Sequence, residues 1–387
     1  MEYRLDELFD LQMGKTPARK NPEYWNSNDH KWISIADLSK CEKYITETKE
    51  HISSIAVQES GISEIPANTV IMSFKLSIGK TAITKEPIYS NEAIMSFRDK
   101  GMTPLLPDYI YYMFSGRDWS KGSNTAVMGT TLNKATLSQI RIYVHAYEDQ
   151  KRIVDLLDKV SSIISKREQE LVELDDLIKA RFVEMFGDPD TNPKGWNECA
   201  LSEKLNVVGG YAFKSDGFSE GSGIPVLRIG NINAGFFRPV NLVYWQEDES
   251  LDRYAMHPGD LVMSLTGTVG KDDYGNVCIL GDDYDMYYLN QRNAKLEIIE
   301  GIDKFYLSQL LKFEQIKKKL TGISRGVRQA NILNKDILNL VVPVPPMELQ
   351  SQFADFIKQV DKSKATVQKA LDETQLLFDS LMQKYFG

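Results

Sequence analysis

Two stretches of the chain, residues 148–187 and 348–387, carry apolar side chains at alternating spacings of four and three residues. That spacing places the apolar residues on one stripe of an α-helix, in the pattern of a coiled-coil seam. The first seam consists of Ile153, Leu157, Val160, Ile164, Arg167, Leu171, Leu174, Ile178, Arg181 and Met185. The second consists of Phe353, Ile357, Val360, Lys364, Val367, Leu371, Thr374, Phe378, Leu381 and Tyr385. Each stretch predicts one helix of roughly 60 Å at 1.5 Å per residue.

The two helical stretches repeat each other at a separation of 200 residues, without a gap. Identical pairs are Gln150 and Gln350, Asp155 and Asp355, Val160 and Val360, Leu171 and Leu371, Glu173 and Glu373, and Leu177 and Leu377. Because the register is shared over the whole length, the pattern favours packing of the two helices against each other. The alternative is that each helix packs only on its own domain.

Proline and glycine mark three of the four helix ends. Pro345-Pro346 precede the second stretch and prevent an earlier start, because proline is excluded from helix interiors. Gly187 ends the first stretch, and Gly387 closes the second. The first stretch follows His145 and Tyr147 where the second has two prolines, so its first residue stays open.

Shorter apolar runs separated by turn residues fill residues 1–147 and 188–347, and they predict strands and short helices. Val70–Lys80 parallels Leu261–Lys271, each a buried strand that leads into a turn rich in serine, threonine and glycine. The other parallels are Asn91-Glu92 with Asn290-Gln291, and Leu132-Asn133-Lys134 with Leu333-Asn334-Lys335. The predicted fold is α+β (mixed α/β), with domain 1–147, helix 148–187, domain 188–347 and helix 348–387, the helices pairing as an antiparallel coiled coil.

The loops have diverged much further than the helices and strands. Gly14–Lys20 and Gly210–Asp216 occupy matching places, yet they share little beyond the glycine. One scaffold with two different sets of loops predicts two sites of the same type with different specificities.

The composition narrows the class of protein. The 387 residues are 42% hydrophobic and 26% charged, as in ordinary soluble proteins. No apolar run reaches the about 18 residues of a membrane span, and the acidic N-terminus is unlike a signal peptide. The scattered cysteines, Cys41, Cys199 and Cys278, indicate a reducing cytoplasm. The four histidines form no cluster with metal-ligand spacing, so no metal site is predicted.

The net charge of −8 does not by itself indicate a nucleic-acid-binding protein. Residues 1–147 contain equal numbers of cationic and anionic side chains, and the remaining segments are mildly acidic. Nucleic-acid binding would therefore require cations gathered on one face of a domain.

Two short motifs imitate enzyme signatures without the context that those enzymes need. Asn21–Tyr24 differs by one residue from the Asn-Pro-Pro-Tyr of adenine methyltransferases, and no glycine-rich turn for a methyl donor lies nearby. Gly14–Thr16 lacks the earlier glycine of a phosphate-binding loop. The chain is therefore predicted to have no catalytic residue and no cofactor of its own.

A DNA-binding function is better supported, because cationic, amide and hydroxyl side chains recur in the loops of both domains. Such groups contact phosphates and read base edges. In the first domain the candidates are Lys15, Thr16, Arg19, Lys20, Tyr24, Trp25, Ser73, Lys75, Ser77, Lys80, Asn124, Thr130 and Thr131. In the second they are Lys214, Arg228, Thr266, Thr268, Lys271, Ser324, Arg325, Arg328 and Gln329. Any one of these loops also fits a solvated turn, and Lys317–Lys319 fit the exposed face of a helix.

The whole chain resembles the specificity subunit of type I restriction-modification systems. The order of domain, long helix, second domain and second long helix carries this resemblance, together with several motifs. The motifs are Gly14–Pro17, Asn21–Trp25, Trp32–Leu38, Ser73–Lys80 and Pro345–Gln350.

The resemblance implies a non-catalytic chain in the cytoplasm that recognises a bipartite sequence in double-stranded DNA, one half per domain. It implies two methyltransferase subunits that bind the long helices and use S-adenosylmethionine. It further implies motor-nuclease subunits that use ATP and Mg, and no membrane partner. Two alternatives stay open: a specificity chain of a type IIB-like enzyme, and a coiled-coil scaffold with two protein-binding domains and no DNA.

If Arg328 reads a base, Arg328→Ala should relax the preference at one base position, at a cost of about 1–3 kcal/mol in binding. Affinities for duplexes that differ at single positions measure this effect. A uniform loss over all duplexes, with a weaker dependence on salt, would instead mark Arg328 as a phosphate contact.

Overall fold

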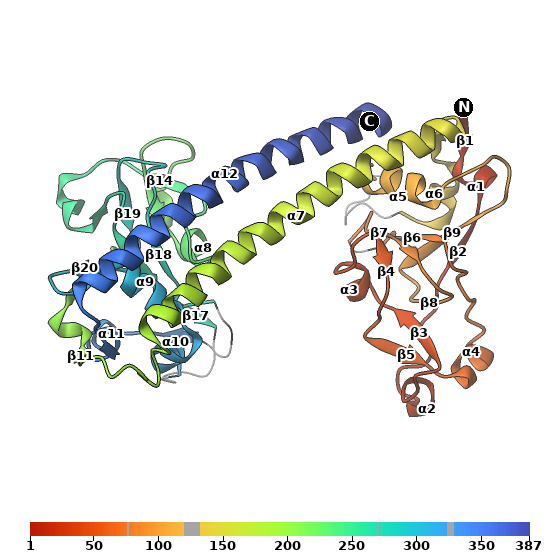
Figure 1. Ribbon diagram of the computed structural model, residues 1–387. Coiled ribbons are helices and arrows are strands. Elements are labelled where there is room, and N and C mark those ends of the chain that lie inside the picture. Colours follow the sequence, from red (N-terminus) through yellow and green to blue (C-terminus); the bar gives the residue numbers. More distant parts are fainter. Residues whose placement is uncertain (76, 120–131, 269–270, 272, 323–328) are drawn as a thin grey trace. The chain divides into compact units, whose positions relative to one another are not determined.

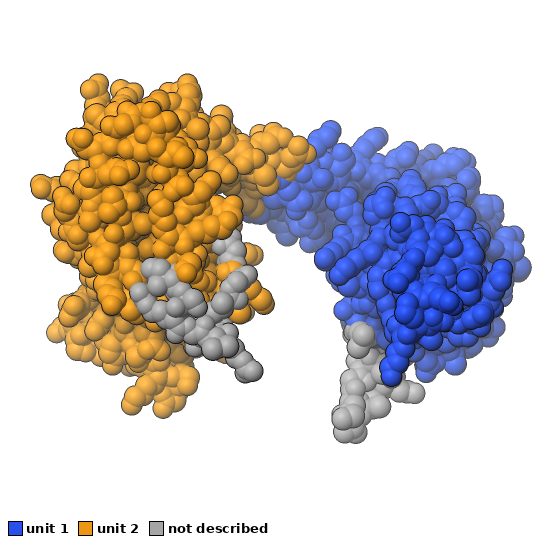
Figure 2. Space-filling model, turned by 90° about the horizontal axis from the view of Figure 1, so that it is seen from below, with its two compact units in different colours: residues 1–168, 369–387 blue, residues 169–368 orange. Residues whose placement is uncertain are grey.

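The computed structural model describes residues 1–75, 77–119, 132–268, 271, 273–322 and 329–387 (Figure 1). Contacts within the chain divide it into unit 1, residues 1–168 and 369–387, and unit 2, residues 169–368 (Figure 2). The division falls inside both long helices. Each unit therefore combines one domain with one half of each helix, whereas the sequence suggested four successive segments.

The two long helices are α7 (Tyr147–Phe186) and α12 (Met347–Phe386), each of 40 residues (Figure 1). Both begin and end one residue earlier than the sequence suggested. In unit 1 the first half of α7 contacts the second half of α12, because Arg167 donates to the carbonyl of Ala370 and to the hydroxyl of Thr374. The antiparallel pairing is therefore confirmed within this unit.

Unit 2 contains the other halves of the same pair. The Nζ of Lys364 lies 2.6 Å from the carboxylate of Asp175, and Arg181 lies over the ring of Phe356 at 5.8 Å. Every seam position predicted from the sequence is buried or half-buried.

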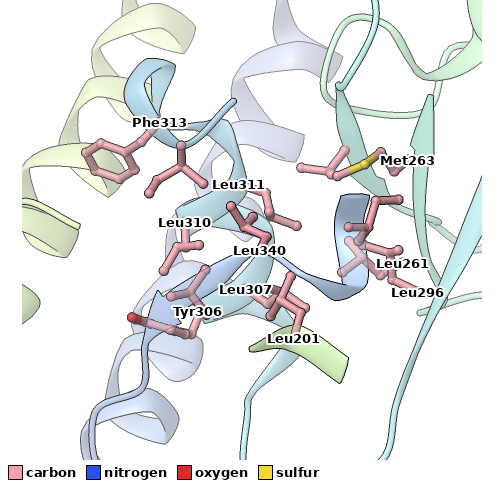
Figure 3. Close-up of a cluster of buried hydrophobic side chains, with 14 of the residues drawn as sticks. Leu201, Leu261, Met263, Leu296, Tyr306, Leu307, Leu310, Leu311, Phe313 and Leu340 are labelled. Carbon is pink, nitrogen blue, oxygen red and sulfur yellow. The ribbon is translucent and has the colours of Figure 1, made fainter. Parts of the chain in front are cut away.

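Each helix half also packs on a domain, so both packing modes expected from the sequence occur together. Ile153 and Leu157 join the apolar core of unit 1, together with Phe378 and Leu381 of α12. Phe182 is fully buried in the core of unit 2, where its ring contacts Tyr306 and Phe313, which are labelled in Figure 3. A half-apolar helix is thereby covered on one flank by its partner and on the other by a domain.

The domain of unit 1 consists of short strands and helices. Its strands are β1 (Glu2–Arg4), β2 (Phe9–Met13), β3 (His30–Ile33), β4 (Tyr44–Ile45), β5 (Glu50–Ile52), β6 (Val70–Ser73), β7 (Thr81–Thr84), β8 (Tyr89–Ser90), β9 (Ile94–Asp99) and β10 (Arg141–Tyr143). Its helices are α1 (Leu5–Leu8), α2 (Pro22–Trp25), α3 (Ile35–Leu38), α4 (Ser54–Ser60), α5 (Pro107–Ser115) and α6 (Lys134–Gln139). The strand orders are β2-β9-β6-β7-β4, β5-β3-β8 and β1-β10.

The domain of unit 2 has the same kind of elements. Its strands are β11 (Glu198–Ala200), β12 (Leu205–Gly209), β13 (Ile224–Leu227), β14 (Val243–Trp245), β15 (Ala255–Met256), β16 (Leu261–Ser264), β17 (Thr266–Thr268), β18 (Val277–Ile279), β19 (Tyr287–Leu289), β20 (Asn293–Ile298), β21 (Gln329–Asn331) and β22 (Val341–Pro343). Its helices are α8 (Ile229–Ile232), α9 (Lys304–Lys312), α10 (Glu314–Thr321) and α11 (Asn334–Leu338), with 3-10 turns η1 (Leu201–Glu203), η2 (Ser215–Gly217) and η3 (Glu249–Tyr254).

The sheets of the two units share most of their strand order. The order β12-β20-β16-β18 of unit 2 repeats β2-β9-β6-β7 of unit 1, and β14-β13-β19 repeats β5-β3-β8. In both units the middle strand of the second set runs parallel to the third. The buried runs Val70–Ser73 and Leu261–Ser264 are equivalent strands, so this part of the sequence repeat is confirmed.

One of the parallels drawn from sequence was displaced by a residue. Leu132 corresponds to the buried Ile332, and not to Leu333, because Leu137 and Ile337 occupy the same buried place in α6 and α11. The buried positions before and within each helix therefore fix how the two segments align. Matching identical residues had shifted this alignment by one position.

A buried glutamine ties the start of each long helix to its domain. In unit 1, Gln150 accepts from the N–H of Leu106 and donates to the carbonyls of Pro104 and His145, each at 3.0 Å. In unit 2, Gln350 accepts from Asp303 N–H at 2.7 Å and donates to a carbonyl. The glutamine repeated in the sequence therefore has the same structural role twice.

Gln150→Ala should lower the free energy of unfolding of unit 1 by about 2–4 kcal/mol, since it leaves buried backbone groups without partners. Denaturant unfolding followed by circular dichroism measures the change. The matched control is Gln375→Ala, an exposed glutamine on α12 in the same unit, which should shift the free energy by less than about 0.5 kcal/mol. Equal losses in both variants would contradict the proposed role.

Candidate nucleic-acid interface

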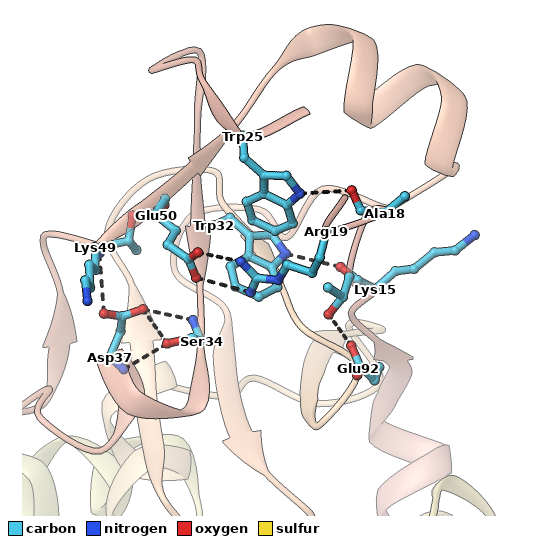
Figure 4. A network of polar contacts seen from close by, with 12 residues as sticks. Lys15, Ala18, Arg19, Trp25, Trp32, Ser34, Asp37, Lys49, Glu50 and Glu92 are labelled. Carbon is cyan, nitrogen blue, oxygen red and sulfur yellow. Dashed lines mark hydrogen bonds and ion pairs between the residues drawn. The ribbon is translucent and has the colours of Figure 1, made fainter. Parts of the chain in front are cut away.

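The loop before β3 in unit 1 holds Arg19 in a fixed position (Figure 4). Its guanidinium forms a two-pronged ion pair with Glu50, with N···O distances of 2.5 and 3.2 Å. The same group lies 3.9 Å from the ring centre of Trp25 and 4.7 Å from that of Trp32. A stacked and paired guanidinium is pre-oriented, because the planar fork loses little further freedom when it binds.

The other predicted residues of this loop also have partners within unit 1. The hydroxyl of Thr16 donates to Glu92, and the ammonium of Lys15 to the carbonyl of Ser60. The phenol of Tyr24 donates to Glu59 at 2.5 Å. The structure therefore brings most of the predicted cluster together, with Lys20 exposed beside it.

The carboxylates of this cluster shape its electrostatics. The hydrogen bond from Thr16 lowers the pKa of Glu92, and the nearby cations Lys75 and Arg19 add to the effect against the opposing effect of burial. Glu92 thus stays anionic and holds the loop. The prediction of binding residues missed Glu50 and Glu92, although Asn91-Glu92 was already visible as a repeated pair.

Two interpretations from sequence change in the structure. Asn21 is a helix cap, because its side chain accepts from Glu23 N–H at the start of α2, so the methyltransferase-like motif has a local structural explanation. Ser73 was predicted to bind DNA, yet it is fully buried: its hydroxyl donates to the Ser77 carbonyl and accepts from Lys80 N–H.

Burial of Ser73 has a counterpart in unit 2. Ser264 is also fully buried at the end of the equivalent strand, and its hydroxyl accepts from Asn276 N–H at 3.1 Å. Both serines therefore close a turn. In the turn after β6, Lys75, Ser77 and Lys80 are exposed, so they remain available for binding.

Unit 2 presents different side chains at the place equivalent to the Arg19 loop. Gly14 and Gly210 correspond, because a Cβ at either would lie within 2.5 Å of the backbone at Ser90 or Asn290. The cavity beside Gly210 has a volume of about 480 Å³. Its lining includes Phe213, Phe218, Arg228, Asn290, Gln291 and Arg292.

Arg228 of this cavity occupies the position that Ser34 has in unit 1, at the N-terminal end of the short helix after the strand. Its guanidinium donates to the carbonyl of Asn241. Lys214 is exposed on the preceding loop. The sequence did not single out Arg292, although it follows the repeated pair Asn290-Gln291.

The turn after β16 carries the next predicted set. Strand β17 pairs with β21, so Thr268 lies opposite Gln329 in the backbone register. Thr268 and Lys271 are exposed. The hydroxyl of Thr266 is buried and has no hydrogen-bond partner among the residues that the structure describes.

Six predicted residues lie outside the described residues, namely Asn124, Thr130, Thr131, Ser324, Arg325 and Arg328. In helix α10, Lys318 and Lys319 lie on the exposed face, as the sequence suggested for the run 317–319, whereas Lys317 is half-buried and donates to Asn276 at 2.6 Å. Lys318 pairs with Glu314 at 2.5 Å, and Lys319 with Asp190 at 2.8 Å.

Within the described part of the chain, no group of three or more His, Cys, Asp or Glu side chains could hold a metal ion. Among the same residues, no helix is both long enough and apolar enough to cross a membrane.

Comparisons with known proteins give a consistent result. A family model described as the type I restriction modification DNA specificity domain matches residues 1–174 and 193–374. The specificity subunit of the type I restriction enzyme MjaIX of Methanocaldococcus jannaschii is 22% identical, over 98% of this chain and 91% of that protein. The MjaVIII specificity subunit of the same organism is 26% identical, over 76% of this chain and 73% of that protein.

Two solved structures share the fold. One belongs to a study of complex assembly and conformational transition of the type I R-M system, with a TM-score of 0.57, 17% identity, and coverage of 100% of this chain and 97% of that one. The other is the S subunit of a type I restriction-modification system from M. genitalium, with a TM-score of 0.53, 14% identity, and coverage of 100% and 96%.

Thr16→Val should raise the pKa of Glu92 toward its ordinary value of 4.5, because it removes the hydrogen bond that lowers it most. The lowered pKa contributes stability above pH 4.5 that is lost as the pH falls through the folded-state pKa. The variant should therefore lose stability near neutral pH but little at low pH. Titration of the Glu92 carboxyl by NMR measures the pKa, with Thr46→Val as an exposed control in the same unit. An unchanged Glu92 pKa would contradict the assignment.

Proposed function

Because the chain belongs to the type I restriction-modification DNA specificity family, we propose that it selects the DNA sequence on which a multi-subunit methyltransferase and endonuclease acts. Each domain reads one half of a bipartite target in double-stranded DNA, with an unspecified spacer between the halves. The chain itself is a non-catalytic subunit.

The observation that carries this proposal is the contrast between a repeated scaffold and unlike loops. Four strands of the first sheet and three of the second follow the same order in both units. At the equivalent place beside the turn after β8 or β19, unit 1 offers Arg19 and Glu92, whereas unit 2 offers Arg228, Gln291 and Arg292. Arginine and amide groups favour different bases, so different loops on one scaffold support two different half-sites.

The long helices connect the two DNA-reading domains. A helix rises by about 1.5 Å per residue, so the length of the pair bears on the spacing of the half-sites. Two methyltransferase subunits dock on the helices and bring S-adenosylmethionine. Motor-nuclease subunits, with ATP and Mg, join the full complex. These partner subunits also contact the DNA. Their contribution explains how a chain with a net negative charge can take part in DNA binding.

Replacing residues 1–147 by the first domain of another family member should change one half of the methylated motif and leave the other half unchanged. Genome-wide mapping of adenine methylation in a host that carries the hybrid and the methyltransferase subunit measures both halves at once. The matched control replaces residues 188–347 and should change the opposite half. If both halves change together, the domains do not read independently.

Removing one heptad from each helix should shorten the preferred spacer. Residues 164–170 and 369–375 are the matched pair, because Arg167 contacts Ala370 and Thr374 across the helix pair. Seven residues correspond to about 10 Å of helix, which is about three base pairs at 3.4 Å each. Selection from duplexes with random spacers measures the preference. The control restores the length with a heptad of different sequence and the same seam, and an unchanged spacer in a functional deletion variant would refute the idea.

A further inference from the structure

A lysine-rich cavity lies in unit 2, where α9 and α10 meet the long helices. Its volume is about 840 Å³. Its charged lining consists of Lys179, Lys271, Lys312, Lys317, Lys318 and Lys364, with Asp175, Asp176 and Glu314. The cavity lining thus has more ammonium than carboxylate groups, whereas the whole chain has a net charge of −8. This concentration of cations on one concave surface is the kind of local cluster that attracts anions.

Ion pairs within the cavity account for part of this charge. Lys364 pairs with Asp175 at 2.6 Å, and Lys318 with Glu314 at 2.5 Å. Lys312 differs, since it has no hydrogen bond and no ion pair among the residues that the structure describes.

The surroundings of Lys312 make an anion at this place favourable. Burial lowers the pKa of the Lys312 ammonium, against the opposing effect of the carboxylates of Asp175 and Asp361. Its side chain nevertheless remains accessible from the cavity. The Lys312 side chain is exposed to solvent, so the burial of its ammonium is incomplete. A bound phosphate would give this ammonium the charged partner that no described residue supplies.

Two glycines keep the cavity floor open beside its lysines. Gly235 has φ +79°, and a Cβ there would lie 3.8 Å from the Nζ of Lys312. Gly275 has φ +70°, and a Cβ there would lie 3.5 Å from the Cε of Lys317. Positive φ angles favour glycine, so the backbone approaches these two lysines without a covering side chain.

Unit 1 has different chemistry at the equivalent place. In the alignment of α5 with α9, Lys312 corresponds to Ser115 and Gln309 to Tyr112. The phenol of Tyr112 donates to Asp158, which also pairs with Lys43 at 2.6 Å. Lys43, the cation that pairs with Asp158 there, is therefore already neutralised.

We propose that the lysine cavity of unit 2 binds phosphate groups of the DNA backbone, next to the half-site that residues 188–347 read. This inference rests on the proposed function. Lysine acts as a point charge toward phosphate and carries little base information, so the cavity supplies affinity and position. Lys271 lines the cavity and lies three residues beyond Thr268, the exposed last residue of β17. Among the described residues of unit 1, Ser115 stands at the place of Lys312, so we expect the two half-sites to depend differently on salt.

The experiment uses the complex of this chain with its methyltransferase subunit. Affinity is measured by fluorescence anisotropy over a range of salt concentrations, on a duplex with the mapped target and on one with both half-sites scrambled. The variants are Lys312→Gln and the double variant Lys271→Gln/Lys312→Gln. The control is Lys204→Gln, which removes the same charge from unit 2 outside the cavity. Lys312→Arg restores the charge.

We expect each neutral variant to weaken binding about threefold to tenfold on both duplexes alike, with the salt slope shallower by about 0.9 per lost phosphate contact. Lys204→Gln and Lys312→Arg should keep the slope of the original chain. The ratio of affinities for target and scrambled DNA should not change.

Three outcomes would overturn the proposal. Unchanged affinity and slope would mean that the cavity does not contact DNA. A changed ratio of affinities would mark Lys312 as a base-reading residue. Loss of the methyltransferase subunit with an unchanged DNA slope would mean that an acidic protein segment occupies the cavity. Failure of the proposed function would look different from failure of the cavity proposal. The original complex would then show no preference for the target duplex, and binding to the scrambled duplex would still test the cavity.

Discussion

The burial of one apolar seam between α7 and α12 is the constraint on which the rest of the structure depends. A helix of 40 residues draws most of its stability from packing of its apolar stripe. In unit 1 this packing brings Phe378, Leu381 and Tyr385, near the end of the chain, against the core of the first domain. The core of the first domain is therefore completed by side chains that lie more than 200 residues further along the chain.

Hydrogen bonds of two buried glutamines attach each long helix to the domain that holds the candidate binding loops. Gln150 and Gln350 connect the first turns of α7 and α12 to the segments before α5 and α9, through hydrogen bonds to backbone groups. Backbone partners do not depend on which loops a domain carries. A scaffold joined in this way tolerates divergence of its loops, because these hydrogen bonds go to backbone groups and not to loop side chains.

The charged side chains form local clusters, although the chain as a whole has no excess of positive charge. Arg19 is balanced by Glu50 of β5, and Thr16 bonds to Glu92 after β8, so carboxylates of other elements order this loop of unit 1. Lys312 has no such partner among the described residues of unit 2. A chain with a net charge of −8 can thus contain surfaces of opposite character, and the sum of its charges says little about either.

The sequence by itself determined the long helices and the repeat of the strands, because heptad spacing and buried strand runs are local patterns. The antiparallel pairing was a prediction that the contact of Arg167 with Ala370 confirmed. The two-domain organisation followed from the same repeat. Only the tertiary structure decided which loop residues are available. Ser73 and Lys75 belong to one turn, yet Ser73 is buried as a turn-closing group and Lys75 is exposed. Partners such as Glu50 for Arg19 come from other elements, and contacts between residues distant in the chain leave no local pattern.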